Sequence, residues 1–200
     1  MCAIIGYSGD YKTDLVTKLC QHSRIRGLHS FGFSYMDGPN LQTNKHLFYD
    51  AFLDDLHTTK PNKFIAHFRY STSGDYKAID NNQPIVRGNI SLVFNGVIDM
   101  ATKAEMEANH GVKLTSENDG ELAVIKLQEN KQDFPQWLNS KTFAGIFFEN
   151  NKITAIRNHK RPCYIGEDKH ATVIASTSDI LTRSNITQFS ILNPNQYYVI

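Results

Sequence analysis

The feature that most constrains this chain is a cysteine at position two, directly ahead of an apolar run. The run Ala3-Ile4-Ile5 ends at Gly6, which indicates a short buried strand that anchors the N-terminus in a sheet. If Met1 is removed, Cys2 carries a thiol with an ordinary pKa of about 8.5 and an α-amine with an ordinary pKa of about 7.7 to 8.0. A nucleophile and a general base then lie on one residue, as is known for an N-terminal threonine acting with its own amine. Taken alone, these residues favour an ordinary strand with a buried cysteine, because free cysteine is among the most buried residue types.

Composition excludes several classes of protein. The chain has 200 residues, of which 40% are hydrophobic and 20% charged, and this predicts one globular domain over residues 1–200. A formal net charge of +1 gives no reason to expect nucleic acid or an acidic membrane surface as a partner. No apolar stretch approaches the roughly 20 residues that span a bilayer, and the N-terminus lacks the features of a signal peptide.

The cysteines and histidines point to neither a disulfide framework nor a metal centre. Cys2, Cys20 and Cys163 form an odd set without close pairing, which fits a reducing cytosol. The histidines are scattered, without the spacing of common metal motifs. We therefore expect a cytoplasmic protein without a metal or another cofactor.

Periodicity predicts many strands and few helices. In the first half we expect a helix from Thr13 to about Ser23, a short helix at 50–56, and strands at 31–36, 45–49, 64–70, 84–86 and 90–94. A polar stretch, 71–82, indicates a loop, and Asn95-Gly96 indicates a turn.

The second half begins with two helices and then becomes rich in strands. We expect helices at 101–109, 119–129 and 178–183, a hairpin turn at 149–152, and strands at 143–148, 153–156, 162–166, 172–176, 189–192 and 197–200. Asn118, with Glu121 three residues later, resembles a capping box. The whole pattern predicts an α+β fold in which two sheets pack face to face with helices outside.

Several short motifs follow Cys2 in a fixed order, and together they resemble one known family. They are Met1 to Gly6, Arg26-Gly27 with Ser30 and Gly32, Ala66 to Gly74 with Asn82-Gln83-Pro84, Phe94-Asn95-Gly96, Asn118-Asp119-Gly120-Glu121, Arg157 to Gly166, and Ala175-Ser176. The set is similar to the glutaminase domain of class II glutamine amidotransferases, which are N-terminal-nucleophile hydrolases. Each motif is weak alone, but the ordered set covers nearly the whole chain.

The resemblance implies a fold, a reaction and a partner. The fold would be a four-layer αββα sandwich of two mainly antiparallel sheets flanked by helices. The reaction would be hydrolysis of the side-chain amide of L-glutamine through a thioester on Cys2. Because the chain ends where the resembled domain ends, the expected acceptor of the ammonia is a separate synthase subunit.

The resemblance also assigns roles to individual residues. Cys2 would attack the amide carbonyl, and Asn95 and Gly96 would form an oxyanion hole for the negative charge that develops. Arg69 would hold the substrate α-carboxylate and Asp119 its α-ammonium group.

Thr72 would help to orient the substrate or the nucleophile, and Arg26 would support Cys2 from nearby. His67 is better explained as a packed strand residue than as the general base, because the α-amine fills that role. Cys20 and Cys163 are expected in the core.

Each of these residues also has an ordinary structural explanation. Asn95-Gly96 alone favours a type I′ turn, Arg69 suits a strand-end salt bridge, and Asp119 suits a helix N-terminus. Two positions depart from the family pattern, with Ala3 in place of glycine and Phe94 in place of histidine. Two alternatives therefore stay open beside the glutaminase, which are an amidase acting on another amide and a catalytically silent binding or regulatory module.

Overall fold

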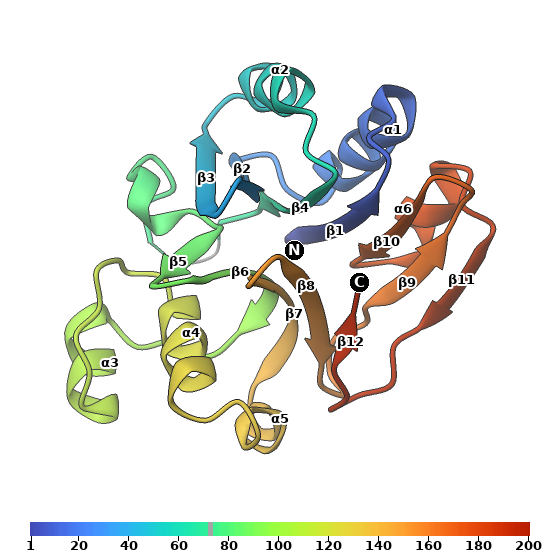
Figure 1. The fold of residues 1–200 in the computed structure, drawn as a ribbon. Coiled ribbons are helices and arrows are strands. Elements are labelled where there is room, and N and C mark those ends of the chain that lie inside the picture. The colour runs from blue at the N-terminus through green and yellow to red at the C-terminus, as the bar shows by residue number, and fades with distance from the viewer. Residues whose placement is uncertain (72–73) are drawn as a thin grey trace.

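Two antiparallel sheets form the centre of the protein (Figure 1), whose computed structural model describes residues 1–71 and 74–200. The first sheet contains β1 (Ala3–Gly9), β2 (Ser30–Asp37), β3 (Asn40–His46), β4 (Lys63–Arg69), β9 (Tyr164–Glu167), β10 (Ala171–Ala175) and β11 (Gln188–Ile191), in the order β11-β9-β10-β1-β4-β2-β3. The second contains β5 (Ile85–Arg87), β6 (Ile90–Val97), β7 (Thr142–Glu149), β8 (Lys152–Arg157) and β12 (Tyr198–Val199), in the order β12-β8-β7-β6-β5.

Helices cover the outer face of each sheet. On the first sheet lie α1 (Thr13–Arg24), α2 (Tyr49–Thr59) and α6 (Ser178–Arg183), and on the second lie α3 (Lys103–His110), α4 (Gly120–Glu129) and α5 (Phe134–Trp137). Two single 3₁₀ turns, Ile79–Asn81 and Leu138–Ser140, lie in the connections. The predicted αββα sandwich is therefore confirmed.

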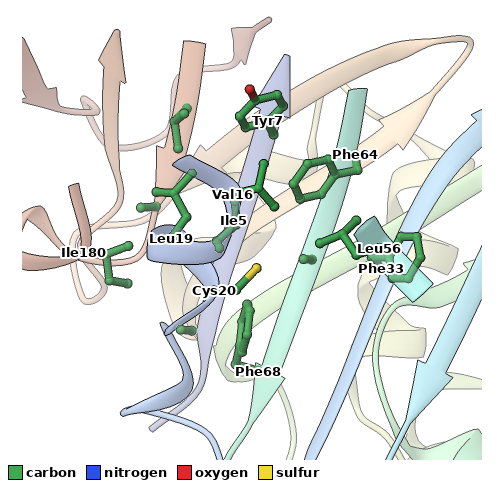
Figure 2. Packing of buried hydrophobic residues seen from close by; sticks show 14 of the residues in the cluster. Ile5, Tyr7, Val16, Leu19, Cys20, Phe33, Leu56, Phe64, Phe68 and Ile180 are labelled. Carbon is green, nitrogen blue, oxygen red and sulfur yellow. The ribbon is translucent and has the colours of Figure 1, made fainter. Parts of the chain in front are cut away.

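Three hydrophobic clusters separate the four layers. One packs α1, α2 and α6 onto the first sheet, a second lies between the two sheets, and a third packs α3, α4 and α5 onto the second sheet. Figure 2 shows the first cluster, where Val16, Leu19 and Cys20 of α1 lie over β1 and β4. Cys20 and Cys163 are both fully buried, as expected.

Strand β1 explains why the N-terminus is so apolar. It lies between β4 and β10, so it has a neighbour on both edges. Ile5 packs against the helices, whereas Ile4 packs between the sheets. A strand covered on both faces needs a continuous apolar run, which is what Ala3-Ile4-Ile5 supplies.

Three local predictions are wrong. The residues predicted as a strand at 45–49 are divided between the end of β3 at His46 and the start of α2 at Tyr49. Asn95-Gly96 does not form a turn, because both residues lie within β6 and pair with Ala144 and Phe143 of β7. In addition to these wrong predictions, the short helix α5 has no counterpart among the predicted elements.

The third error concerns the start of α4. The Glu121 carboxylate does not reach back to cap this helix. It instead accepts hydrogen bonds from the backbone N–H groups of Thr115 and Ser116, at 2.8 to 3.0 Å, and from their hydroxyls. Asn118 does act locally, since its Oδ1 accepts the Gly120 N–H at 3.0 Å.

The hairpin at 149–152 is confirmed. Glu149 pairs with Lys152, and both Asn150 and Asn151 have positive φ angles, of 50° and 58°. This conformation matches the right-handed twist of the flanking strands. Across the described part of the chain, no helix is long and apolar enough to cross a membrane.

Candidate active site

The ends of β1, β4 and β6 meet the start of α4 around one small cavity. Its free volume is about 40 Å³, well below the roughly 300 to 1,000 Å³ of typical small-molecule sites. It is lined by Cys2, Arg69, Tyr70, Gln83, Phe94, Gly96, Asn118 and Asp119. Four of the residues singled out in the sequence thus come together, from positions 2, 69, 96 and 119.

Two wider hollows lie elsewhere, and neither is lined by a cysteine. One, of about 600 Å³, lies between Lys45 of β3 and Val86 of β5, and the other, of about 650 Å³, lies among the β2–β3, β5–β6 and β7–β8 turns. The small cavity is the better candidate for catalysis despite its size, because it alone of the three combines a thiol with buried charges of both signs.

The Cys2 thiol lies against the chain that leaves β4. Tyr70 donates its backbone N–H to Sγ at 3.5 Å, and Sγ lies 3.7 Å from the Tyr70 carbonyl oxygen. Burial raises the pKa of this thiol above its ordinary value, and the Tyr70 N–H, the terminal ammonium group, Arg69 and Arg26 act in the opposite direction. The Cys2 thiol thus lies near several groups that favour its thiolate, but burial outweighs them and its pKa is raised.

Arg26 holds the backbone of the N-terminus and not the thiol itself. Its Nε donates to the carbonyl oxygen of Cys2 at 3.3 Å. The thioether sulfur of Met1 lies 3.9 Å from Arg26 and 3.2 Å from Nη1 of Arg161. Two guanidinium groups therefore contact the residues that begin the chain.

Arg69 is buried at the end of β4, with only 5% of its surface exposed. Its Nη1 donates to Oδ1 of Asn82, and Asn82 in turn donates to the Tyr76 carbonyl at 2.7 Å. Burial lowers the pKa of Arg69, while the nearby Cys2, Asp119 and Asp75 raise it. A buried guanidinium with an anion-sized space beside it is suited to bind a carboxylate.

Asp119 precedes α4 and faces the same cavity. Its Oδ2 accepts the backbone N–H groups of Ile98 at 2.7 Å and Asp99 at 3.1 Å, which fixes the carboxylate beside the end of β6. Its Oδ1 has no hydrogen bond to the described residues. Burial raises the pKa of Asp119, and the two N–H bonds oppose that shift.

Asn95 and Gly96 are adjacent in β6 but present different groups. Val93, two residues earlier, packs between the sheets with Ile4, so the side chain of Asn95 points to the same layer. Asn95 is 4% exposed, and its side chain makes no hydrogen bond to the described residues. Gly96 lines the cavity with its backbone. A Cβ there would lie 1.9 Å from the Thr142 carbonyl oxygen, so only glycine allows β6 to approach β7 this closely.

The remaining predicted residues differ in their placement. Thr72 lies outside the described residues. His67 is completely buried in β4, neither ring nitrogen has a hydrogen-bond partner among the described residues, and burial lowers its pKa to about 3. It is thus a neutral, packed strand residue, as expected, and its position gives it no route to act as a base.

Of the two departures from the family pattern, Ala3 is not among the residues that line the cavity, whereas Phe94 is. Ala3 packs against the helices over the first sheet, on the opposite face of β1 from Ile4. Phe94 stacks on Phe143, with ring centroids 5.5 Å apart, and contacts α4 at Gly120. The extra Cβ of Ala3 therefore alters packing under the helices, and Phe94 places an aromatic residue in the wall of the cavity.

Gln83 lines the cavity, although no role was predicted for it from the sequence. It is 5% exposed, and its Oε1 accepts the backbone N–H of Phe94 at 2.6 Å. Its place in the Asn82-Gln83-Pro84 motif was the only signal, and an amide side chain carries no charge or reactivity that would mark it.

Comparison with known proteins gives a consistent result. No family model matches the chain. The glutamine–fructose-6-phosphate aminotransferase (isomerizing) of Bacillus licheniformis is 26% identical over 191 residues, which cover 88% of this chain and 32% of that protein. The amidophosphoribosyltransferase of Methanothermobacter thermautotrophicus is 32% identical over 155 residues, which cover 70% of this chain and 32% of that protein.

Solved structures agree on the fold. The glutamine phosphoribosylpyrophosphate amidotransferase of B. subtilis, complexed with ADP and GMP, superposes with a TM-score of 0.72 at 19% identity, over 100% of this chain and 49% of that one. A glutamine aminotransferase class-II domain protein from Silicibacter pomeroyi superposes with a TM-score of 0.60 at 11% identity, over 100% of this chain and 98% of that one. The chain is thus similar in sequence to glutamine amidotransferases and has the fold of a class II glutamine amidotransferase domain.

The chain spans about a third of the length of the two curated relatives described above, 32% of each. Among the residues that the structure describes, no three histidine, cysteine, aspartate or glutamate side chains gather into a group that could hold a metal ion.

Proposed function

We propose that this protein hydrolyses the side-chain amide of L-glutamine with Cys2 as the nucleophile. The observation that carries the proposal is the assembly of the Cys2 thiol, the buried Arg69 guanidinium and the Asp119 carboxylate around one cavity. A free amino acid has an α-carboxylate and an α-ammonium group, and this pair of buried charges is complementary to both. An amide within a peptide chain would leave both charges unmatched.

The reaction would proceed in two halves. The Cys2 thiolate attacks the amide carbon, and the carbonyl oxygen becomes an oxyanion that accepts hydrogen bonds from the Gly96 N–H and the Asn95 side chain. The carbon–nitrogen bond then breaks, and ammonia leaves with a proton returned by the Cys2 α-amine, giving a thioester. Water hydrolyses the thioester to glutamate and regenerates the thiol.

Two further points belong to this proposal. Removal of Met1 supplies the α-amine of Cys2. The ammonia would pass to an acceptor-binding partner on a separate chain or a separate domain. Thr72 is proposed to orient the substrate, and Arg26 to hold the Cys2 carbonyl.

The decisive experiment is ammonia release from L-glutamine by protein whose Met1 removal is verified by intact mass. We expect Cys2→Ala to abolish release and Cys20→Ala, which removes a fully buried thiol under α1, to retain it. 6-Diazo-5-oxo-L-norleucine should add to Cys2 alone. Glutamine hydrolysis by Cys2→Ala, or labelling of another cysteine, would exclude this mechanism.

Arg69 tests the substrate class within the same assay. Arg69→Lys keeps the charge but loses the two-pronged geometry that matches a carboxylate. We expect KM for glutamine to rise about 10- to 100-fold, with a smaller change in kcat. The control is Arg183→Lys, at an exposed arginine of α6. An unchanged KM would point to an amide substrate without an α-carboxylate.

One observation favours the silent module as a second candidate. Met1 is held by sulfur contacts to Arg26 and Arg161, and a retained Met1 blocks the amine. Intact mass of the protein purified from its own cells distinguishes the two functions, because a silent module has no need of the trimmed form.

A further inference from the structure

One edge of β6 continues beyond the strand that pairs with it. Strand β5 pairs with residues 90 to 92 of β6, whereas β7 pairs with β6 up to Val97. Beyond Leu92, the backbone groups on the β5 side of β6 therefore have no strand opposite them. These groups come from alternate residues, because neighbouring residues of a strand direct their N–H groups to opposite sides.

The hydrogen bonds along β6 identify which residues face that open edge. Val97 donates its N–H to Thr142 of β7 at 2.8 Å, so odd-numbered residues here face β7. Phe94 donates to Oε1 of Gln83 at 2.6 Å, and Ile98 donates to Oδ2 of Asp119 at 2.7 Å. Gly96 lies between these two and directs its N–H to the same edge.

The Gly96 N–H has no acceptor among the described residues, and Gly96 lines the cavity beside Cys2. Its two neighbours on the edge are each fixed by a buried side chain, since Gln83 is 5% exposed and Asp119 faces the cavity. Neighbouring N–H groups on one edge are roughly 7 Å apart. The N–H proposed to bind the oxyanion therefore lies between two N–H groups that are bonded to side chains and not to a neighbouring strand.

We propose that Gln83 is a positioning residue for the oxyanion site, and that it acts through the Phe94 N–H. Where β5 ends, Gln83 and Asp119 accept the N–H groups of Phe94 and Ile98 that a longer strand would have bound. The Gly96 N–H between them is held in place and stays available to an oxyanion. A longer β5 would fix β6 equally well but would occupy the donor. The inference rests on the proposed function, and it adds a second task to Asp119.

Loss of the Gln83 side chain should affect the rate of catalysis more than the binding of substrate. Without an acceptor, the buried Phe94 N–H is left unsatisfied, and the edge of β6 shifts or admits water. A donor that is misplaced by about 1 Å costs on the order of 100-fold in rate. Substrate binding should change little, because Gln83 does not supply the charges that hold glutamine.

The test compares two variants of similar size. Gln83→Met fills the space without an acceptor, and Gln83→His offers a neutral ring nitrogen to the Phe94 N–H at pH 8. For Met1-trimmed protein we expect Gln83→Met to lower kcat about 10- to 100-fold, with KM and the inhibition constant of glutamate unchanged within twofold. Gln83→His should recover most of the loss.

A second measurement does not depend on activity. Amide hydrogen exchange by NMR should show protected Phe94 and Ile98 N–H groups and a faster Gly96 N–H, and Gln83→Met should speed exchange at Phe94 at least 10-fold. If the wild type shows this pattern but does not hydrolyse glutamine, the proposed function is wrong, whereas the fixing of the β6 edge by Gln83 and Asp119 is supported.

Three results would contradict the role proposed for Gln83. Wild-type kcat in Gln83→Met, an effect confined to KM, or a histidine variant as slow as the methionine variant would overturn the role of Gln83. If Gln83→Met does not unfold cooperatively, Gln83→Asn removes the same bond with a side chain one methylene shorter and replaces it in each assay.

Discussion

At the scale of single residues, the unusual property of this protein is how many ionisable or reactive side chains it buries at one end of β4. Cys2, Arg69 and Asp119 surround one small cavity, and each has a pKa displaced by its burial. His67, on the same strand, has its pKa lowered to about 3 by the same cause. Burial strengthens the electrostatic interactions that catalysis uses, and it makes the protonation of any of these groups costly.

His67 makes this cost measurable. Its folded pKa lies below the unfolded value of about 6.5, so the unfolded chain binds the proton first as pH falls. The stability that depends on neutral His67 is complete above about pH 6.5 and is lost progressively between about pH 6.5 and 3. We expect wild-type protein to lose about 2 kcal/mol more unfolding free energy between pH 7 and 5 than His67→Leu does.

Urea denaturation at the two pH values gives this difference directly. His170→Leu, at a partly buried histidine in the β9–β10 turn, serves as the control and should keep the wild-type pH dependence. Equal slopes for wild type and His67→Leu would mean that His67 is not the group that titrates.

At the scale of elements, helix α4 and strand β6 are joined at one tight contact. A Cβ on Gly120, the first residue of α4, would lie 2.3 Å from the ring of Phe94 and 2.4 Å from Ile85. Asp119 immediately precedes this point, and Asn95 and Gly96 immediately follow Phe94. The contact therefore sets the distance between the residue proposed to bind the ammonium group and the residues proposed to bind the oxyanion.

Gly120→Ala tests this contact against simple helix propensity. Alanine improves helix propensity by about 1 kcal/mol, but the crowding of Phe94 should reverse that gain. We expect a net loss of roughly 1 to 3 kcal/mol in unfolding free energy, measured by chemical denaturation. The double variant with Phe94→Ala should make the added methyl group nearly neutral relative to Phe94→Ala alone. A stabilised single variant would contradict the contact.

The same element shows what the sequence could and could not reveal. Apolar runs predicted most of β6 and β7, and apolar residues around most of the circumference predicted α4, because these elements are buried on nearly all sides. Asn95-Gly96 was misread as a turn, because the dipeptide carries a local turn signal, whereas pairing with β7 and the close approach of Thr142 determine its real conformation. Such contacts come from residues nearly 50 positions away and leave no local trace.

The site was predictable to a similar degree. Reactivity marked Cys2, and the resemblance of the ordered motifs to a known family marked Arg69 and Asp119; these three lie together around the cavity. Gln83 was missed because its importance lies in one hydrogen bond to a backbone N–H, and any polar loop residue could have made it. Asn118 and Glu121 were assigned to helix capping by spacing, but Glu121 instead satisfies the Thr115–Ser116 turn.

At the scale of the whole molecule, the layer between the sheets joins both halves of the site. Ile4 and Ile65 enter it from the strands that carry Cys2 and Arg69, and Val93 and Ile146 enter it from the second sheet. The sheets are close here, since a Cβ on Gly6 would lie 3.3 Å from Ile146 and Ile153. Loss of this layer should therefore affect both sheets at once.

Ile146→Ala tests that cooperativity. We expect a loss of about 2 to 5 kcal/mol in unfolding free energy, with one shift seen by two probes. Fluorescence of the single tryptophan, Trp137, reports the helices on the second sheet, and alkylation of the buried Cys20 reports the helices on the first. Val86→Ala, at a side chain 43% exposed, should change both little. Separate transitions would show that the sheets unfold independently.

The central position of β1 has a consequence for biosynthesis. β1 is flanked by β4 and by β10, whose residues 171–175 follow it by more than 160 positions. A ribosome therefore releases β1 long before its second neighbour exists, and the segment ahead of Cys2 remains open to an aminopeptidase during most of translation. Once β10 is added, the Met1 sulfur lies against Arg26 and Arg161, and 60% of the surface of Met1 stays exposed. The sheet around β1 is then completed only when a strand at the far end of the chain has been synthesised.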